Sequence, residues 1–209
     1  MSEPETKRVK TDTEPEYELI YWPVIPGRGE LIRLLFEEAG VAYKDTAKDK
    51  NVQNVVSKVM ELTSSSDNPI FAVPALRHGD VLLSQVPNIL QYLAPKLGLA
   101  PSSDSTGVAS AQLNQIVMTI LDGLVVELHD THHPISIDQA YEEQKPEAKK
   151  RATYFRAARL PKYLGYVQRV IAANPDAGEE EPWLYGGSLT YADLVLFQVR
   201  RDIPLNTSQ

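Results

Sequence analysis

The chain has 209 residues, enough for one large domain or two small ones. Its 21 basic and 28 acidic residues give a net charge of −7, which argues against a nucleic-acid partner and gives no reason to expect binding to an anionic membrane. The sequence contains no cysteine, so disulfides, zinc-thiolate sites and catalysis by a protein thiol are excluded.

Residues 1–16 are polar and of mixed charge, which predicts a disordered tail. The basic run Lys7–Lys10 could be a nuclear signal, but a solvated tail is the favoured interpretation. The tail lacks the apolar segment of a signal peptide, and we find no apolar run near the roughly 18 residues that a membrane span needs. We therefore expect a cytoplasmic protein without membrane contact.

The first half of the chain alternates predicted strands with predicted helices. Strands are expected at 17–22, 41–43, 70–76 and 81–83, and helices from Leu31 to Gly40, at 52–62 and from Ile89 to Gly98. The last two strands flank a Gly-Asp turn, which predicts a β-hairpin, and Pro74 should lie at the edge or start of its strand. Residues 17–98 thus form a small α/β domain with helices on the faces of a sheet.

The second half, after a predicted linker at 99–104, shows only helical patterns, so residues 105–209 form an all-helical domain. Helices are expected at 111–128 and 146–173, and a third is expected to begin at a capping box. In that box Thr190 should cap the amide of Asp193, and Asp193 should reach back to the amide of Thr190.

Three segments resemble the cytosolic glutathione transferases of the tyrosine type, and look closest to a group of fungal members. They are Tyr21-Trp22-Pro23-Val24-Ile25-Pro26-Gly27-Arg28-Gly29-Glu30-Leu31-Ile32-Arg33, then Val73-Pro74-Ala75-Leu76 through Gln85 to Tyr92-Leu93, and Thr190-Tyr191-Ala192-Asp193. The resemblance implies a thioredoxin-like N-terminal domain, an all-α C-terminal domain and a homodimer.

By this resemblance Tyr21 is the catalytic residue. Thiolates are the nucleophiles of sulfur chemistry, and a fixed hydroxyl donor stabilises the anion. Glutathione would supply the sulfur as a co-substrate, with no permanently bound cofactor and with an electrophilic small molecule as second substrate. The alternative is that Tyr21 is only an aromatic residue of the strand.

The resemblance also assigns the glutathione-binding residues. Val73-Pro74 would form a cis-proline turn whose Val73 backbone pairs with the tripeptide, and the alternative is a trans proline at a strand edge. Gln85 would bind the γ-glutamyl end. The family usually has serine at the next position, where this chain has Val86, so we expect weaker binding by about 1 kcal/mol if one net hydrogen bond is lost.

Other candidates keep open alternatives. Asp122 would reach the partner subunit's glutathione, or it is an exposed helix carboxylate. Arg28 would contact glutathione or, as we favour, form an interdomain ion pair. The glycyl carboxylate could be held by any of three lysines, namely Lys44, Lys48 and Lys50.

Three histidines, His129, His132 and His133, have a spacing that can place them on one helix face. Metal binding is possible at such a spacing, but no carboxylate pattern beyond Asp130 supports it, so we predict no metal site. Lining the second-substrate cleft or ending the helix is the favoured role.

The C-terminal domain looks truncated, because family members continue the last helix and add others. We expect apolar helix faces to be exposed as a result. The predicted function is a glutathione transferase-like enzyme that adds the glutathione sulfur to an electrophile, in detoxification or in fungal secondary metabolism. The alternative is a catalytically weak or inactive binding or scaffolding protein with the same fold.

Overall fold

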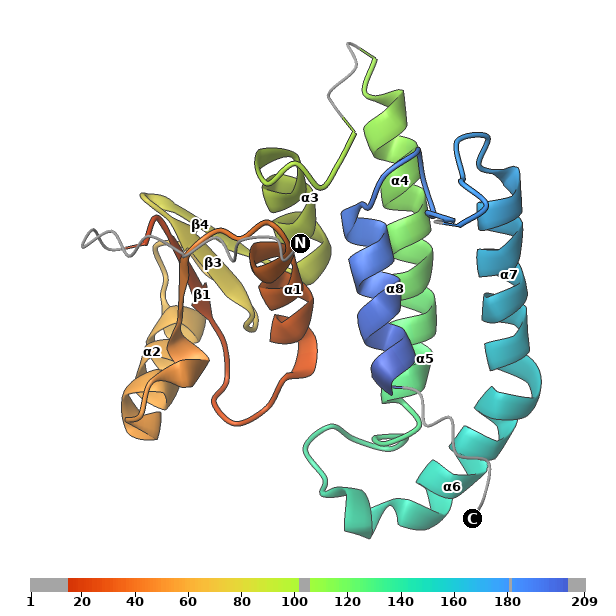
Figure 1. Ribbon diagram of the computed structural model, residues 1–209. Coiled ribbons are helices and arrows are strands. Elements are labelled where there is room, and N and C mark those ends of the chain that lie inside the picture. The colour runs from red at the N-terminus through yellow and green to blue at the C-terminus, as the bar shows by residue number, and fades with distance from the viewer. Residues whose placement is uncertain (1–14, 102–105, 181, 203–209) are drawn as a thin grey trace, which may run out of the picture.

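A computed structural model describes residues 15–101, 106–180 and 182–202. The first domain contains a four-stranded sheet in the order β2-β1-β3-β4 (Figure 1). Its strands are β1 Tyr17–Ile20, β2 Tyr43–Asp45, β3 Ala75–His78 and β4 Val81–Ser84. Strand β1 pairs in parallel with β2 and antiparallel with β3, which forms the expected hairpin with β4.

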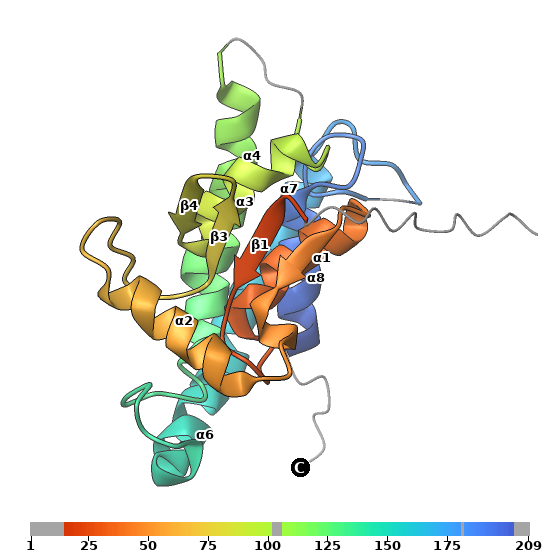
Figure 2. The same ribbon diagram turned by 90° about the vertical axis from the view of Figure 1, so that its left-hand side faces the viewer.

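Helices cover both faces of this sheet. They are α1 Glu30–Glu38, α2 Val52–Ser64 and α3 Val86–Lys96. Leu19 and Leu76 point to the face covered by α1 and α3, whereas Ile20 and Ala75 point to the opposite face, where Val59 of α2 packs on them. Figure 2 shows α2 apart from α1 and α3. The strand alternation therefore gives each sheet face its own apolar cluster.

The observed strands differ from the predicted ones at their ends. Strand β2 begins at Tyr43, two residues later than expected, and β1 ends at Ile20 instead of residue 22. The third strand begins only at Ala75, because Pro74 has no N–H to donate to a ladder. Pro74 thus precedes the strand, and the Val73-Pro74 bond is cis as expected.

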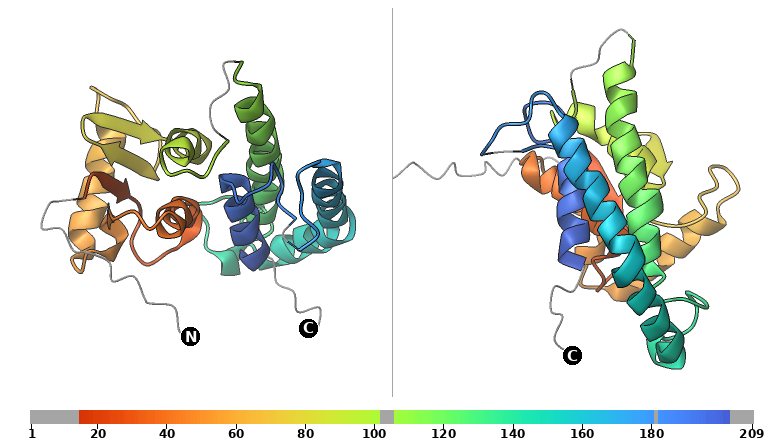
Figure 3. Two further views of the ribbon diagram at one scale, coloured as in Figure 1. Left: turned by 45° about the horizontal axis from the view of Figure 1, so that its top comes forward. Right: turned by 90° about the vertical axis from the view of Figure 1, so that its right-hand side faces the viewer.

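All regular elements of the second domain in the described residues are helices, and the domain is built around two long helical runs. The central run consists of α4 Val108–Met118, a π-helical segment Thr119–Val125 and α5 Val126–His129. The outer run consists of α6 Lys145–Tyr154, a second π-helical segment Phe155–Arg159 and α7 Leu160–Ala173. Helix α8, Tyr191–Asp202, completes the domain. Figure 3 shows α8 and the central run between the first domain and α7.

The start of α8 confirms half of the predicted capping box. The Asp193 carboxylate accepts the Thr190 N–H at 2.8 Å, as expected. The other half is wrong, because the Thr190 hydroxyl donates to the same carboxylate oxygen at 2.8 Å instead of accepting an amide. The second Asp193 oxygen accepts the Leu184 N–H at 2.9 Å. Asp193 therefore anchors both the helix start and the loop before it.

One core continues from the first domain into the second. It joins Ile32 and Leu35 of α1 to Leu121 of the central run and Val195 of α8. Leu99, inside the predicted linker, is also buried in this core. The carbonyl of Leu99 accepts the Tyr191 N–H at 2.9 Å, which ties the connection to the first turn of α8.

The central run also qualifies by length and composition as a membrane span. Its residues Val108–His129 form 22 continuous helical residues that contain an 18-residue window of mean hydropathy 1.3, which the sequence pattern did not reveal. Leu113, Val117 and Leu124 of this run are buried in the shared core. Packing inside the domain therefore accounts for part of its apolar character, since 33% of the apolar window is buried.

Some predictions concern residues outside the described part of the chain. Residues 1–14 of the predicted disordered tail and residues 102–104 of the predicted linker fall there. So do residues 203–209, which follow α8 and on which the predicted truncation partly depends. The domain boundaries and the truncation stay predictions.

Candidate functional site

Strand register brings the predicted glutathione-binding residues to one edge of the sheet. Ile20 is opposite Ala75, and Ala75 is opposite Ser84. The residues that follow or precede these partners, Tyr21, Pro74 and Gln85, therefore leave the same end of three neighbouring strands. Residues as distant in sequence as Tyr21 and Gln85 thus share one edge.

The Tyr21 side chain is buried and fixed by the chain that follows it. Its hydroxyl oxygen accepts the Arg28 backbone N–H at 3.0 Å, and the residue is only 6% exposed. Its own N–H donates to the Thr46 hydroxyl at 3.2 Å. A tyrosine hydroxyl can both accept and donate a hydrogen bond. The contact with Arg28 uses the oxygen as an acceptor, so the hydroxyl hydrogen is left for donation to a ligand.

Two glycines allow this close approach. A Cβ at Gly27 would lie 2.3 Å from the Tyr21 hydroxyl oxygen, and one at Gly29 would lie 2.7 Å from the ring. Gly27 also has a φ of +45°, which side chains rarely adopt. Sequence reasoning placed both glycines inside the resembling segment but assigned them no role.

Arg33 holds the loop that carries these groups. Its Nε donates to Asp45 at 2.7 Å, and its Nη1 donates to Glu30 at 3.0 Å and to the Pro26 carbonyl at 3.1 Å. Its guanidinium carbon also lies 5.8 Å from the centre of the Tyr21 ring. Burial alone would lower the pKa of Arg33, but its carboxylate partners, Asp45 foremost, raise that pKa.

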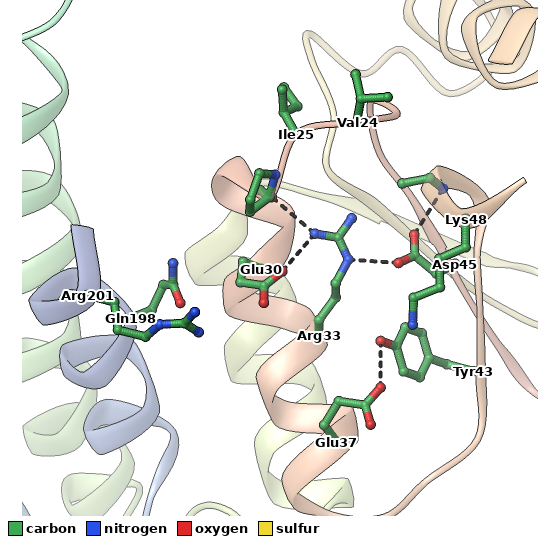
Figure 4. A pocket seen from close by; sticks show the side chains of 12 residues that line it. Val24, Ile25, Glu30, Arg33, Glu37, Tyr43, Asp45, Lys48, Gln198 and Arg201 are labelled. Carbon is green, nitrogen blue, oxygen red and sulfur yellow. Dashed lines mark hydrogen bonds and ion pairs between the residues drawn. The ribbon is translucent and has the colours of Figure 1, made fainter.

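Figure 4 shows Arg33 between Glu30 and Asp45 in a pocket of about 550 Å³, with Gln198 and Arg201 of α8 on the far side. The Tyr43 hydroxyl in this pocket donates to Glu37 at 3.0 Å. All three carboxylates of the pocket therefore have partners already. We assign this pocket a structural role in supporting the Tyr21 loop.

A larger cavity lies between the two domains beside Tyr21. This interdomain cleft has a volume of about 700 Å³. It is lined by Tyr21, Ile25, Pro26, Gly27, Arg28, Leu31, Val125, Leu128, His129, His132, Gln198 and Val199. Most of these side chains are apolar, so the cleft suits an apolar molecule with a few polar groups.

The other predicted glutathione residues lie beside Tyr21 with different degrees of exposure. In the part of the chain described, the Val73 backbone makes no hydrogen bond, which leaves its N–H and C=O available to an added strand. Gln85 is exposed, with a φ of +70°, directly before α3. The Val86 side chain is buried in the core at 2% exposure, and only its backbone is at the helix start.

Arg28 and Asp122 lie apart from the sheet edge. Arg28 is exposed on the wall of the interdomain cleft, and it forms no ion pair with any residue that the structure describes, contrary to the favoured prediction. Asp122 is exposed within the π-helical segment of the central run and does not line the cleft. Its predicted contact with a partner subunit's ligand stays a prediction.

The three candidate lysines differ in their surroundings. Lys44 pairs with Glu18 at 3.2 Å, and its side chain is therefore partly engaged. Lys48 lies with its ammonium 5.4 Å from the Tyr43 ring centre, and Lys50 is exposed. These contacts leave Lys48 and Lys50 less constrained by carboxylates than Lys44.

The three histidines do not form a metal site. Among described residues no group of three His, Asp or Glu side chains could hold a metal ion. His129 and His133 stack with ring centres 5.1 Å apart, and His129 and His132 line the cleft. Burial, followed by the nearby His133 and Arg28, lowers the pKa of His129.

The fold and this site define a thioredoxin-like domain followed by a helical domain, with a tyrosine hydroxyl at their junction. The family model "Glutathione S-transferase, C-terminal domain" matches residues 129–207. A glutathione S-transferase of Plasmodium falciparum is 27% identical over 186 residues, 88% of this chain and 79% of that protein. Glutathione S-transferase P 1 of Xenopus laevis is 28% identical over 190 residues, 88% of this chain and 76% of that protein.

Solved structures agree on the fold. The Pi-class glutathione S-transferase of Onchocerca volvulus superposes with a TM-score of 0.63 at 21% identity, over 89% of this chain and 76% of that chain. The glutathione S-transferase of Ascaris lumbricoides superposes with a TM-score of 0.60 at 24% identity, over 91% of this chain and 83% of that chain. The chain is thus similar in sequence to glutathione S-transferases and shares their fold.

Proposed function

We propose that this protein is a glutathione transferase that activates the thiol of glutathione at Tyr21 for addition to an electrophile in the interdomain cleft. The observation that carries the proposal is the Tyr21 hydroxyl, which accepts the Arg28 N–H at 3.0 Å and lines a cleft of about 700 Å³. The superfamily likeness supports a transferase activity and glutathione as co-substrate.

Glutathione would lie along the sheet edge formed by Val73, Pro74 and Gln85. The γ-glutamyl end would meet Gln85 and the start of α3, where the Val86 amide and the helix dipole favour a carboxylate. The sulfur would then point to the Tyr21 hydroxyl. That hydroxyl donates its hydrogen to sulfur, which favours the thiolate over the thiol. The thiolate attacks the electrophile, and the proton of the thiol goes to solvent.

The finer expectations remain part of this proposal. We propose a cytoplasmic homodimer in which Asp122 reaches the glutathione of the partner subunit. A role in detoxification or in fungal secondary metabolism also stays a prediction, since the relatives reported above come from Plasmodium, a frog and nematodes. Neither proposal is needed for thiol activation at Tyr21.

The test compares the wild type with Tyr21→Phe on a glutathione-affinity column and in a conjugation assay. We expect both proteins to be retained, because Val73 and Gln85 bind the peptide, and we expect Tyr21→Phe to lose at least about tenfold in kcat/KM, since it removes a hydrogen bond made to the anion. Equal activity of the two proteins would overturn the tyrosine mechanism.

The second candidate function is a non-catalytic binding protein. The buried Val86 favours it, because a valine offers no hydroxyl to the γ-glutamyl carboxylate. Retention on glutathione with no conjugation by the wild type would support this function.

A further inference from the structure

A single side chain holds the backbone at the point where the chain leaves strand β1. The strand ends at Ile20, so Tyr21 lies one residue beyond the ladder that joins β1 to its neighbours. The Tyr21 N–H donates to the Thr46 hydroxyl oxygen at 3.2 Å, and this hydroxyl donates to the Tyr21 carbonyl at 3.5 Å. Because a hydroxyl has one hydrogen and two lone pairs, it can make both contacts at once. One hydroxyl thus binds both peptide groups of Tyr21.

Thr46 is a rigid support for these two contacts. It is only 6% exposed, and it begins the 3-10 turn Thr46–Lys48 that follows β2. The Asp45 carboxylate accepts the Ala47 N–H at 3.0 Å through one oxygen and the Arg33 Nε–H at 2.7 Å through the other. These contacts fix the backbone on both sides of Thr46. Its β-branched side chain also has few rotamers, so the hydroxyl keeps one position.

The Tyr21 side chain is therefore held at both of its ends. The Arg28 N–H contacts its hydroxyl at 3.0 Å, and Thr46 holds its backbone. The hydroxyl lies at the far end of a long, stiff side chain, so a small rotation of the backbone moves the hydroxyl much further. A misplacement of about 1 Å in a reacting group can lower a rate about 100-fold.

We infer that Thr46 is a positioning residue for thiol activation, and that its hydroxyl sets the direction in which the Tyr21 side chain leaves β1. This inference rests on the proposed function. Thr46 acts on the sulfur only through the Tyr21 hydroxyl, so its contribution should vanish when that hydroxyl is absent. It should also vanish where the thiol ionises unaided. An ordinary thiol has a pKa of about 8.5, and well above that pH glutathione is a thiolate without help from the protein.

The experiment follows conjugation of glutathione to chlorodinitrobenzene by the full chain as a function of pH, after subtraction of the uncatalysed rate. We expect Thr46→Val to lower kcat/KM about tenfold at about pH 6.5 and less than about twofold at about pH 9.5. The KM for glutathione should change by less than about twofold, since Val73 and Gln85 bind the peptide. Thr46→Ser keeps the hydroxyl and should stay within about twofold of the wild type at every pH.

Thr190→Val is the matched control for the loss of a buried hydroxyl. Thr190 is 4% exposed, and its hydroxyl donates to Asp193 at 2.8 Å at the start of α8. This variant should melt at a lower temperature than the wild type but keep the pH dependence of its kcat/KM. Melting curves of Thr190→Val and Thr46→Val separate a loss of stability from a loss of positioning.

A second comparison places Thr46→Val in the Tyr21→Phe protein. There the hydroxyl to be positioned is gone, so we expect the added substitution to change kcat by less than about twofold. A merely structural role of Thr46 would lower the activity by the same factor in both backgrounds. The double variant therefore tests whether Thr46 acts through the Tyr21 hydroxyl.

The outcomes distinguish the inference from the proposed function. If Thr46→Val lowers kcat/KM equally at every pH, equally in both backgrounds, or not at all, the inference is wrong and the proposed function stands. If neither Thr46→Val nor Thr46→Ala folds, the hydroxyl serves the fold, and the inference is likewise overturned. If the wild type neither binds nor conjugates glutathione, the proposed function is wrong, and the inference fails with it. A loss confined to low pH and to proteins that keep Tyr21 supports both.

Discussion

The Tyr21 side chain shows how a reactive group is held by residues that have no reactive chemistry of their own. The ring lies against the backbone at Gly27 and Gly29, where a Cβ would come within 2.3 Å and 2.7 Å of it. The hydroxyl then meets the Arg28 N–H at 3.0 Å. This contact leaves the tyrosine little freedom, so its direction toward the cleft is set before a ligand arrives.

Gly27→Ala is therefore expected to damage activity more than stability. An alanine at this positive φ should lower the free energy of unfolding by about 1 to 2 kcal/mol, as at any position with a left-handed backbone. The added methyl group would in addition displace the Tyr21 hydroxyl, and we expect kcat/KM to fall at least about tenfold, as for a lost transition-state donor. Unfolding midpoints and conjugation rates of the variant measure the two effects.

Gly40→Ala is the matched control, because Gly40 has a φ of +64° and no atom lies within 4 Å of the place that an added methyl group would take. It should lose stability like Gly27→Ala but keep the activity of the wild type. Should both variants lose activity equally, the close approach to Tyr21 would not be what positions the hydroxyl.

At the scale of elements, the sequence predicted most helices and the order of strands but not the details that shape the site. Apolar spacing predicted runs at 111–128 and 146–173, and the structure has runs at 108–129 and 145–173. The π-helical segments inside these runs leave the apolar periodicity nearly unchanged, so no pattern indicated them. Asp122 lies in one of them.

The site itself was predictable only where a residue resembles a known motif. Tyr21, Pro74 and Gln85 were named from such motifs, and the strand register brings them to one edge. Thr46 and Arg33 were not assigned roles, because their partners depend on the tertiary fold. Thr46 binds Tyr21 from 25 positions away, and Arg33 binds Asp45 from 12 positions away.

The two long helical runs are joined by a hydrogen-bonded cluster of charged and polar side chains, and its contribution to stability depends on pH. Arg159 donates to Glu127 through Nε and Nη2, the shortest distance being 2.6 Å, and Tyr163 donates to Glu127 at 2.7 Å. The hydrogen bond from Arg159, foremost, lowers the pKa of Glu127, while burial opposes it. The lowered pKa means that the cluster stabilises the fold above the unfolded-state pKa and loses this effect as pH falls through the folded-state pKa.

Glu127→Gln should therefore lower the melting temperature by a few degrees at pH 7, and the difference from wild type should shrink below about pH 4. Thermal melts of both proteins across this pH range provide the measurement. Glu142→Gln is the control, since Glu142 pairs with Lys145 while their side chains are 75% and 58% exposed, and it should change little at any pH. A difference between wild type and Glu127→Gln that does not vary with pH would contradict this explanation.

At the scale of the whole molecule, the two domains share one core instead of meeting at a thin interface. Ile32 and Leu35 of the first domain are buried in the same cluster as Leu121 and Val195 of the second. The cleft that would hold the electrophile takes its walls from both domains. Opening either domain would therefore expose the apolar surface of the other, and this couples their unfolding.

We expect calorimetry of the full chain to show one unfolding transition that glutathione shifts as a whole. Although Val73 and Gln85 belong to the first domain, the shared core transmits the stabilisation to both. At a hundredfold excess over Kd, binding to the folded state alone adds about 2.7 kcal/mol, or about 5 to 10 °C for a chain of this size. Glycine at the same concentration is the control for nonspecific solute effects. Two separate transitions, of which glutathione shifts only one, would show that the domains unfold independently and that the shared core does not couple them.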